Sequence, residues 1–134
     1  MSAASLAMIT LDSADPARLA AFWAEFLGGR IIHETDEVVV VSTDRGGIAT
    51  CRVPDYTPPT WPAGDKPKHM HLDLAVEDKD AAETEALRLG ARVAENQPGG
   101  DTWRVLLDPA GHPFCLTSIP LGWPAIESAS STED

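Results

Sequence analysis

The segment at residues 69–78, HMHLDLAVED, places ionisable side chains at alternate positions. Successive residues of a β-strand point to opposite faces of a sheet, so the pattern predicts a strand with one apolar face and one face able to carry chemistry. His71 lies on that second face, and Asp73 is expected to share it. An imidazole exchanges protons near neutral pH, which makes His71 a candidate catalytic base or ligand contact. The alternative is a histidine that is simply held in place by the neighbouring carboxylate.

Two cysteines occupy matching positions, since Cys51 and Cys115 each follow a turn glycine by four residues. If both thiols lie near His71, the three side chains suit Zn(II), and a further thioether from Met8 would suit Cu(I). The alternative is that both cysteines are reduced and pack as small hydrophobic residues. A cysteine–histidine nucleophilic pair would need hydrogen-bond reach between the two groups, and no local hydrolase signature accompanies it.

Aromatic residues and charge bear on the kind of ligand. Trp103 begins a predicted strand and, if it faces a cavity, offers a flat wall for a planar molecule. Trp61, beside a proline, is expected to pack a connecting segment onto a sheet. The 21 acidic residues outnumber the 10 basic ones, giving a net charge of −11. That charge disfavours nucleic acids and anionic membrane surfaces as partners, and it favours neutral or cationic small molecules.

The predicted elements that position these residues form a pattern that occurs twice in the chain. Residues 8–31 and 71–93 each contain an alternating apolar strand, an aspartate suited to cap a helix, an amphipathic helix and a glycine after it. Asp15 and Asp78 are the predicted caps, and the helices are expected at about 16–27 and 79–89. Three strand signals follow each helix: RIIHE, EVVVVST and GIATCRV, then ARVAE, TWRVLLD and HPFCLTS. The chain therefore reads strand–helix–strand–strand–strand, twice over.

This repeat predicts a single α+β domain over residues 1–120, with modules at about 6–55 and 69–119. Neither module alone can cover its sheet, so the two should pair about a pseudo-twofold axis. The proline-rich residues 56–68 form the expected connector, and 121–134 are expected to end in a disordered tail. No apolar run approaches the roughly 18 residues of a membrane span, and the start lacks a signal peptide, so we expect a cytoplasmic protein.

The paired βαβββ modules resemble the vicinal oxygen chelate superfamily, which includes glyoxalase I, bleomycin-resistance proteins and extradiol dioxygenases. The segments that carry the resemblance are DPARLAAFWAEFLG, the WP pair at 61–62, HLDLAVED and LLDPAGHPFCL. Together they are most similar to the glyoxalase-like subfamily common among actinobacterial proteins. The resemblance implies a curved mixed sheet around a cavity, and a homodimer.

The resemblance also implies where a metal would bind. In metal-dependent members, the opening residue of each module's first strand and one residue of its last strand supply the ligands. These positions correspond to Met8, Cys51, His71 and Cys115. The family uses His, Glu and sometimes Gln there, and only His71 matches. Neither the usual divalent site nor a triad of two histidines and a carboxylate can be assembled from this set.

The sequence thus predicts a protein that binds a small organic molecule in its cavity without the usual divalent metal. The alternative is a metal-dependent lyase, isomerase or dioxygenase with an atypical His/Cys site, holding Zn or Cu at Cys51, His71 and Cys115. Whether the chain is an enzyme stays open at this point. The expected pocket residues are Met8, Cys51, His71, Asp73, Trp103 and Cys115.

Overall fold

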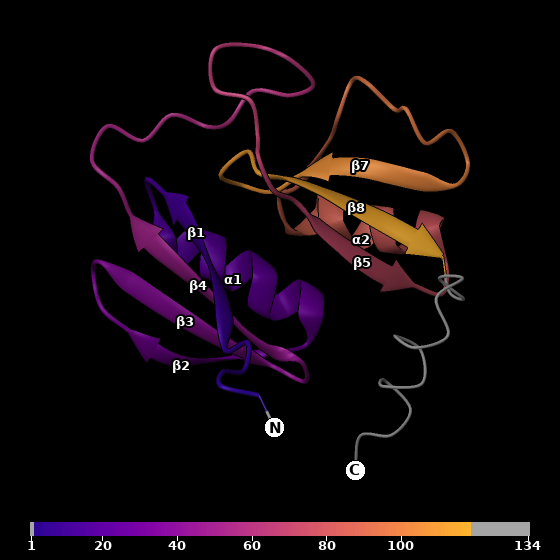
Figure 1. The fold of residues 1–134 in the computed structure, drawn as a ribbon. Helices are drawn as coiled ribbons and strands as arrows, with labels where there is room; N and C mark the ends of the chain where they lie inside the picture. Colours follow the sequence, from indigo (N-terminus) through magenta and orange to yellow (C-terminus); the bar gives the residue numbers. More distant parts are fainter. Residues whose placement is uncertain (1, 119–134) are drawn as a thin grey trace.

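The computed structural model describes residues 2–118, and the tail predicted at 121–134 lies outside them. The expected strand–helix–strand–strand–strand order is confirmed in both modules (Figure 1). The first module holds β1 (Met8–Ser13), α1 (Pro16–Leu27), β2 (Arg30–Glu34), β3 (Val38–Thr43) and β4 (Gly46–Arg52). The second holds β5 (Leu72–Val76), α2 (Lys79–Leu89), β6 (Arg92–Val93), β7 (Trp103–Leu107) and β8 (Pro113–Ser118).

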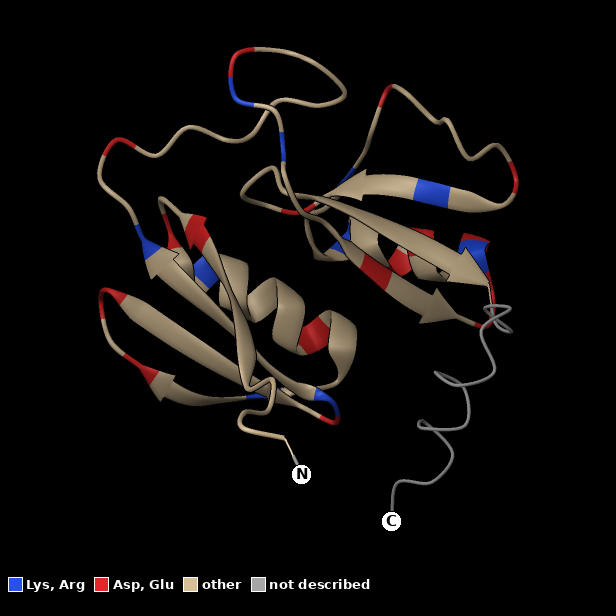
Figure 2. Cartoon of the chain, viewed as in Figure 1, with Lys and Arg blue, Asp and Glu red and all other residues tan. Residues whose placement is uncertain are grey.

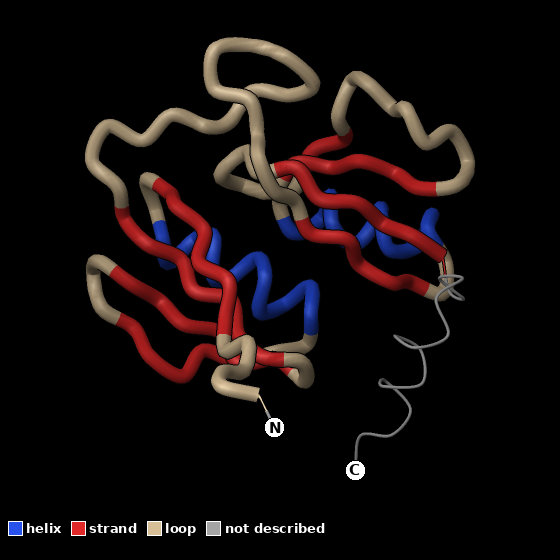
Figure 3. The backbone as a smooth tube through the Cα atoms, in the orientation of Figure 1, coloured by secondary structure: helices blue, strands red, loops and turns tan. Residues whose placement is uncertain are grey.

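Each module builds its own mixed four-stranded sheet, in the order β1-β4-β3-β2 and β5-β8-β7-β6. The first strand of each module runs parallel to the last, and the other pairs are antiparallel. One helix packs on one face of each sheet and leaves the other face open (Figure 3). The α+β class with tandem βαβββ modules is therefore confirmed, with two sheets rather than one continuous sheet.

Local sequence sets the ends of both helices. The carboxylate of Asp15 accepts the backbone N–H of Arg18 at 3.1 Å, and Asp78 accepts that of Ala81 at the same distance. Gly28 and Gly90 end the helices with φ of 67° and 118°, a left-handed conformation that glycine adopts without a Cβ clash. The predicted caps are thus confirmed.

The two modules share one hydrophobic core. Trp23 of α1 is 1% exposed and its ring centroid lies 5.0 Å from that of Phe114 in β8. Leu106 and Leu116 of the second sheet join the same cluster as Leu19 of α1. Because side chains of α1 pack against side chains of β7 and β8, neither module buries its apolar surface alone.

A buried carboxylate joins the modules at the edge of this core. Asp108 is fully buried and accepts hydrogen bonds from Trp23 Nε1 at 3.1 Å and from the backbone N–H groups of Ala110 and His112. Burial raises the pKa of Asp108, against the opposing effects of His112 and of these hydrogen bonds. Nearby, the Tyr56 hydroxyl donates to the Ala110 carbonyl at 2.8 Å and so ties the connector to the second module.

No helix among residues 2–118 is long and apolar enough to cross a membrane.

Candidate ligand-binding cavity

A cavity of about 690 Å³ lies on the open face of the second sheet. Its size is within the range of roughly 300–1,000 Å³ that is usual for small-molecule sites. The walls come from β5, β7, β8, the loop before β7 and the connector between the modules. The lining residues are Trp61, Lys68, His71, Asp73, Leu74, Thr102, Trp103, Val105, Pro113, Cys115 and Thr117.

Strand alternation explains why the polar residues reach this cavity. Leu72, Leu74 and Val76 pack against the core shared with the helices, so the residues between them turn to the opposite face. On the neighbouring strand, Phe114 and Leu116 enter the same core, and Cys115 between them belongs to a separate cluster on the cavity side.

Three side chains that can bind a proton or a metal meet in the cavity. His71 Nε2 lies 3.1 Å from Asp73 Oδ1, and Asp73 pairs directly with Cys115 across the β5–β8 ladder. One donor atom from each of these three residues lies within 4.8 Å of the others. The sequence-based expectation that His71 is held by Asp73 agrees with this geometry, and the same contact leaves the imidazole in the cavity lining.

The thiol of Cys115 is protonated at neutral pH. Burial, together with the charge and hydrogen bond of Asp73, raises its pKa to about 11, while Lys68 acts in the opposite direction. A nucleophilic cysteine needs a lowered thiol pKa, so the raised pKa of Cys115 argues against a Cys115–His71 nucleophilic pair.

Two tryptophans border the cavity from separate segments. Trp103, at the start of β7, is 37% exposed, which is unusual for so large an apolar side chain. Trp61 comes from the connector and packs against Ala94, Val105 and Cys115. The sequence indicated a packing role for Trp61 and did not place it at the site. The sequence feature that could have indicated this role is the large apolar side chain of Trp61 in an otherwise polar connector, because such a side chain is expected to be buried against another element.

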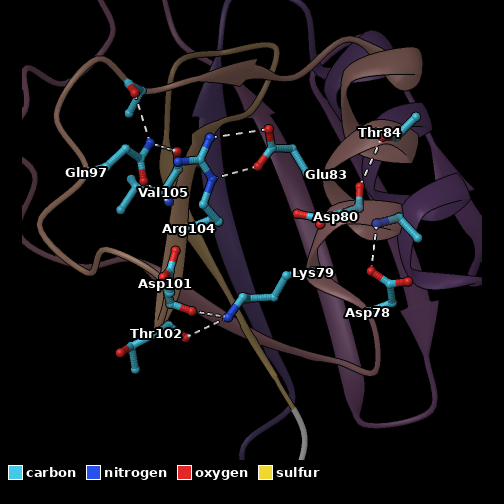
Figure 4. A network of polar contacts seen from close by, with 12 residues as sticks. Asp78, Lys79, Asp80, Glu83, Thr84, Gln97, Asp101, Thr102, Arg104 and Val105 are labelled. Atoms are coloured by element: carbon cyan, nitrogen blue, oxygen red, sulfur yellow. Dashed lines mark hydrogen bonds and ion pairs between the residues drawn. The ribbon is translucent and has the colours of Figure 1, made fainter.

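The loop at 94–102 holds the Trp103 wall in place. Gln97 donates to the carbonyls of Ala94 and Val105 at 2.9 and 2.8 Å, and its own amide oxygen accepts the N–H of Val105 at 2.9 Å (Figure 4). Lys79 of α2 donates to the Asp101 carbonyl from the other side. The loop is therefore tied at both ends to regular structure.

The Trp103 ring also lies directly on the backbone of this loop. A Cβ added to Gly99 would come within 2.4 Å of a ring carbon of Trp103. Arg104, next in β7, pairs with Glu83 of α2 at 2.7 Å and fixes the strand that carries the ring (Figure 4). This wall is thus preformed by local contacts.

Met8 and Cys51 of the first module do not border this cavity. Met8 is 45% exposed and pairs with Gly47, whereas Cys51 pairs with Asp12, four steps further along the β1–β4 ladder. Four strand residues span roughly 13 Å. The structure therefore brings together His71, Asp73, Trp103 and Cys115, but not Met8 and Cys51 with them.

The length of two hairpin turns explains this difference. Thr43 pairs with Gly46, which leaves two residues in the β3–β4 turn. Leu107 pairs with Pro113, which leaves five residues, 108–112, in the β7–β8 turn. Counting from a turn glycine therefore does not give equivalent strand positions in the two modules. The residue of β4 that faces Thr10, as Cys115 faces Asp73, is Ala49.

Acidic side chains are spread over both modules, and the few basic ones are scattered among them (Figure 2). Within the cavity, Asp73 and Lys68 carry opposite charges.

The model of the family described as "Glyoxalase-like domain" matches residues 8–117. The chain belongs to the glyoxalase-like domain family. Solved structures of the glyoxalase/bleomycin-resistance/dioxygenase group agree with this assignment at the level of the fold. A family enzyme from Burkholderia phytofirmans is 16% identical, with a TM-score of 0.67 over 87% of this chain and 99% of that one. A glyoxalase-related enzyme from Fulvimarina pelagi is 18% identical, with a TM-score of 0.64 over 87% and 89% of the two chains.

The fosfomycin resistance protein FosX from Mesorhizobium loti is 15% identical, with a TM-score of 0.64 over 90% of this chain and 96% of that one. A comparison with curated protein sequences gave no match. The likeness to solved structures therefore establishes the glyoxalase fold, and the chemistry has to be argued from this chain's own residues.

The donor set of this glyoxalase-like chain differs from the usual metal site of its superfamily. Of the positions that correspond to the usual ligands, His71 and Cys115 border the cavity, and Met8 and Cys51 do not. Asp73 supplies a third donor from β5, and His71 immediately precedes this strand. All three donors come from one module, so the residues fit a three-ligand site and not a site shared by both modules.

Proposed function

We propose that this glyoxalase-like protein binds a small planar organic molecule in the cavity of its second module, without the divalent metal site of its metal-dependent relatives. The observation that carries the proposal is that Trp61 and Trp103 border one cavity together with the His71–Asp73 pair. Aromatic side chains provide the stacking surface, and a few polar groups fix orientation, which is the usual composition of a small-molecule site.

The polar groups favour a ligand that donates hydrogen bonds. The Asp73 side chain is 64% exposed. Its carboxylate can accept a hydrogen bond from a ligand N–H or O–H and still remain partly hydrated. His71 is 33% exposed beside it and can donate or accept, according to its tautomer. The acidic charge of the whole chain further favours neutral or cationic ligands over anionic ones.

Structural neighbours support the small-molecule class. They include FosX from Listeria monocytogenes, complexed with Mn(II) and 1S,2S-dihydroxypropylphosphonic acid, and a lactoylglutathione lyase from Agrobacterium tumefaciens. Both names refer to small organic molecules, although both proteins are only distantly similar to this chain.

Ligand binding can be tested with a panel of small molecules of three kinds: flat aromatic cations such as proflavine, neutral catechols and non-planar aliphatic amines. We expect the flat molecules to raise the melting temperature, since a ligand at 100 times its Kd adds about 2.7 kcal/mol to stability. Trp103→Leu should weaken binding by about fivefold, because stacking contributes about 1 kcal/mol beyond the area that it buries. Cys51→Ser is the matched control, since Cys51 lies outside the cavity.

Two results would contradict this proposal. One is that no member of the panel shifts the melting temperature of the wild-type protein. The other is that binding survives in Trp103→Leu and in a His71→Ala variant that remains folded, because the ligand would then occupy another site.

A second candidate function is a metal-dependent lyase, isomerase or dioxygenase, and the clustering of His71, Asp73 and Cys115 favours it. These residues would hold a borderline metal such as Zn(II), with an open position for substrate. The metal would act as a Lewis acid on a bound oxygen. Since the Cys115 pKa is about 11, the thiol must lose a proton on binding, and metal affinity should rise with pH.

Elemental analysis of protein purified without chelators distinguishes the two candidates. A metal-dependent enzyme would carry a stoichiometric ion that is lost in Cys115→Ser and Asp73→Asn but kept in Cys51→Ser. Substoichiometric metal that does not respond to these substitutions would contradict the second candidate and leave ligand binding as the function.

Three narrower expectations remain proposals: a homodimer, a cytoplasmic location and a closer relationship to actinobacterial members of the family. The homodimer draws support from apolar side chains left open on the first module, with Ile32 57% and Met8 45% exposed. Light scattering coupled to size exclusion should give twice the chain mass of 14.3 kDa, and a value equal to that mass would contradict the dimer.

A further inference from the structure

A second cavity, of about 250 Å³, lies where the two modules meet. It shares no lining residue with the cavity beside His71. Its walls come from the start of α1, from the connector and from the β7–β8 turn. Two arginines border it: Arg18 from α1 and Arg92, which opens β6.

Neither arginine has a carboxylate partner among residues 2–118, where the ion pairs found involve other residues. Arg18 reaches Asp15 through its backbone N–H and not through its guanidinium. Acidic residues outnumber basic ones in this chain by 21 to 10, so potential partners are plentiful. Both arginines are exposed, so their guanidinium groups are free to bind a negatively charged occupant of the cavity.

Contacts around Gly90 explain how arginines from both modules come together. A Cβ on Gly90 would lie 3.5 Å from Arg18 Nη2 and 3.6 Å from Pro109, so the guanidinium lies against the end of α2. Arg92 follows two residues later and pairs with Leu107, immediately before the β7–β8 turn. The module interface therefore sets the position of both side chains.

The remaining walls are closely packed. The connector touches the β7–β8 turn so tightly that a Cβ on Gly111 would lie 2.7 Å from Pro58. The Tyr56 hydroxyl is already engaged with the Ala110 carbonyl at 2.8 Å. The carboxylate of Asp15, which also borders the cavity, caps α1. No side-chain hydrogen bond of Arg18 or Arg92 to residues 2–118 is found, so both guanidinium groups remain available as donors to an occupant.

We propose that this junction cavity is a second binding site, specific for a small molecule that carries a carboxylate or phosphate group. The planar guanidinium fork binds either group through two parallel hydrogen bonds. The acidic surface of the chain repels extended polyanions, so the site should select a compact oxyanion. The site is independent of the function proposed for the His71 cavity.

The internal repeat supplies a matched control. The LGAR sequence that contains Arg92 corresponds to LGGR in the first module, which contains Arg30. Arg30 opens β2, is exposed and does not border the junction cavity. Arg18 corresponds to Ala81 in the second helix. The positions equivalent to Arg18 and Arg92 are therefore Ala81 and Arg30, which do not form a second arginine pair.

The test is titration of the full-length protein with inorganic phosphate and, separately, with succinate, at constant ionic strength balanced by chloride. Calorimetry and thermal unfolding should both show saturable binding of at least one of the two, and that one identifies the preferred group. Arg18→Gln and Arg92→Gln should each weaken binding by about tenfold or more, whereas Arg30→Gln should leave it unchanged. Arg18→Lys keeps the charge but loses the fork, and it should also weaken binding.

The proposal is overturned if neither anion binds saturably, if the two glutamine variants bind as the wild type does, or if Arg30→Gln loses as much affinity as they do. Should Arg18→Gln unfold because its guanidinium supports the end of α2, Arg92→Gln decides the question alone. Success or failure here leaves the Trp103→Leu result at the other cavity unaffected, since the two sites share no residue.

Discussion

The carboxylate of Asp73 influences the acidity of the Cys115 thiol in the main cavity. They face each other across the β5–β8 ladder, and the thiol pKa of about 11 reflects burial first and Asp73 second. His71 completes the cluster through its 3.1 Å contact with Asp73. A change at Asp73 therefore alters both the acidity of the thiol and the position of the imidazole, while burial by the surrounding strands stays the same.

Replacement of Asp73 by Asn should lower the pKa of Cys115, because the negative charge that opposes thiolate formation is removed. Since burial remains, the pKa should stay above the ordinary value of 9.0. The pH dependence of iodoacetamide alkylation, measured in a Cys51→Ser background, reports this pKa directly. An alkylation profile identical to that of Cys51→Ser alone would show that Asp73 does not act on the thiol.

Among the elements, the loop at 94–102 has the clearest structural role, because it presents Trp103 to the cavity. Gln97 ties the loop to β7, and Lys79 ties it to α2. The backbone of Gly99 supports the ring, and there is no room for a side chain between them. The shape of the cavity therefore depends on a residue that does not line it.

Replacement of Gly99 by Ala should displace the Trp103 ring and lower stability by roughly 1–3 kcal/mol, the usual cost of overpacking. The near-ultraviolet circular dichroism of tryptophan should change with it, and ligands of the main cavity should bind more weakly. Gly100→Ala is the neighbouring control, because a Cβ there meets nothing within 4 Å, although its φ of 56° adds some backbone strain. Equal spectra and affinities in both variants would mean that Gly99 does not position the ring.

At the scale of the whole molecule, the two modules are joined through one aromatic core and one buried carboxylate. Trp23 packs on Phe114, and its indole N–H donates to Asp108. His112 and Tyr56 are the titratable groups beside this carboxylate, and burial together with the nearby acidic groups raises the pKa of Tyr56 to about 12. Below that pH the tyrosine stays protonated, so the Tyr56 hydroxyl does not contribute to the pH dependence of stability between pH 4 and 8.

The free energy of unfolding should therefore depend on pH through Asp108. A carboxyl whose pKa is raised on folding binds more protons in the folded state, so its contribution to stability is complete below the unfolded pKa of about 3.9 and is lost as pH rises through the folded pKa. Asp108→Asn should be less stable than wild type near pH 4 by about 1–3 kcal/mol. The reason is that the amide NH2 of Asn would face the Trp23 indole N–H, so two donors would oppose each other and the hydrogen bond would be lost. That deficit should shrink as pH rises.

Urea unfolding of wild type and Asp108→Asn between pH 4 and 8 measures the change, with exposed Asp44→Asn in the β3–β4 turn as the control. A deficit that grows with pH would show that folding lowers the pKa of Asp108 instead of raising it.

The order of the elements could be predicted from the sequence because the signals are local. Alternation marks β5, Asp15 and Asp78 cap the helices through contacts three residues away, and Gly28 and Gly90 end them. The same alternation put His71 and Asp73 on the open face, and the start of β7 put Trp103 beside them. For these features the residues that decide the structure are neighbours in the chain.

What only the tertiary structure decided depends on residues far apart in the chain. The turn of five residues before β8, against two before β4, moves Cys51 out of register with Cys115, although both follow a glycine by the same distance. Trp61 reaches the cavity only because the connector folds across the second sheet. Arg18 and Arg92 border one cavity because Arg18 of α1 lies against the end of α2 at the module interface. Strand register and module packing minimise the free energy of the whole chain, so no short segment can specify them alone.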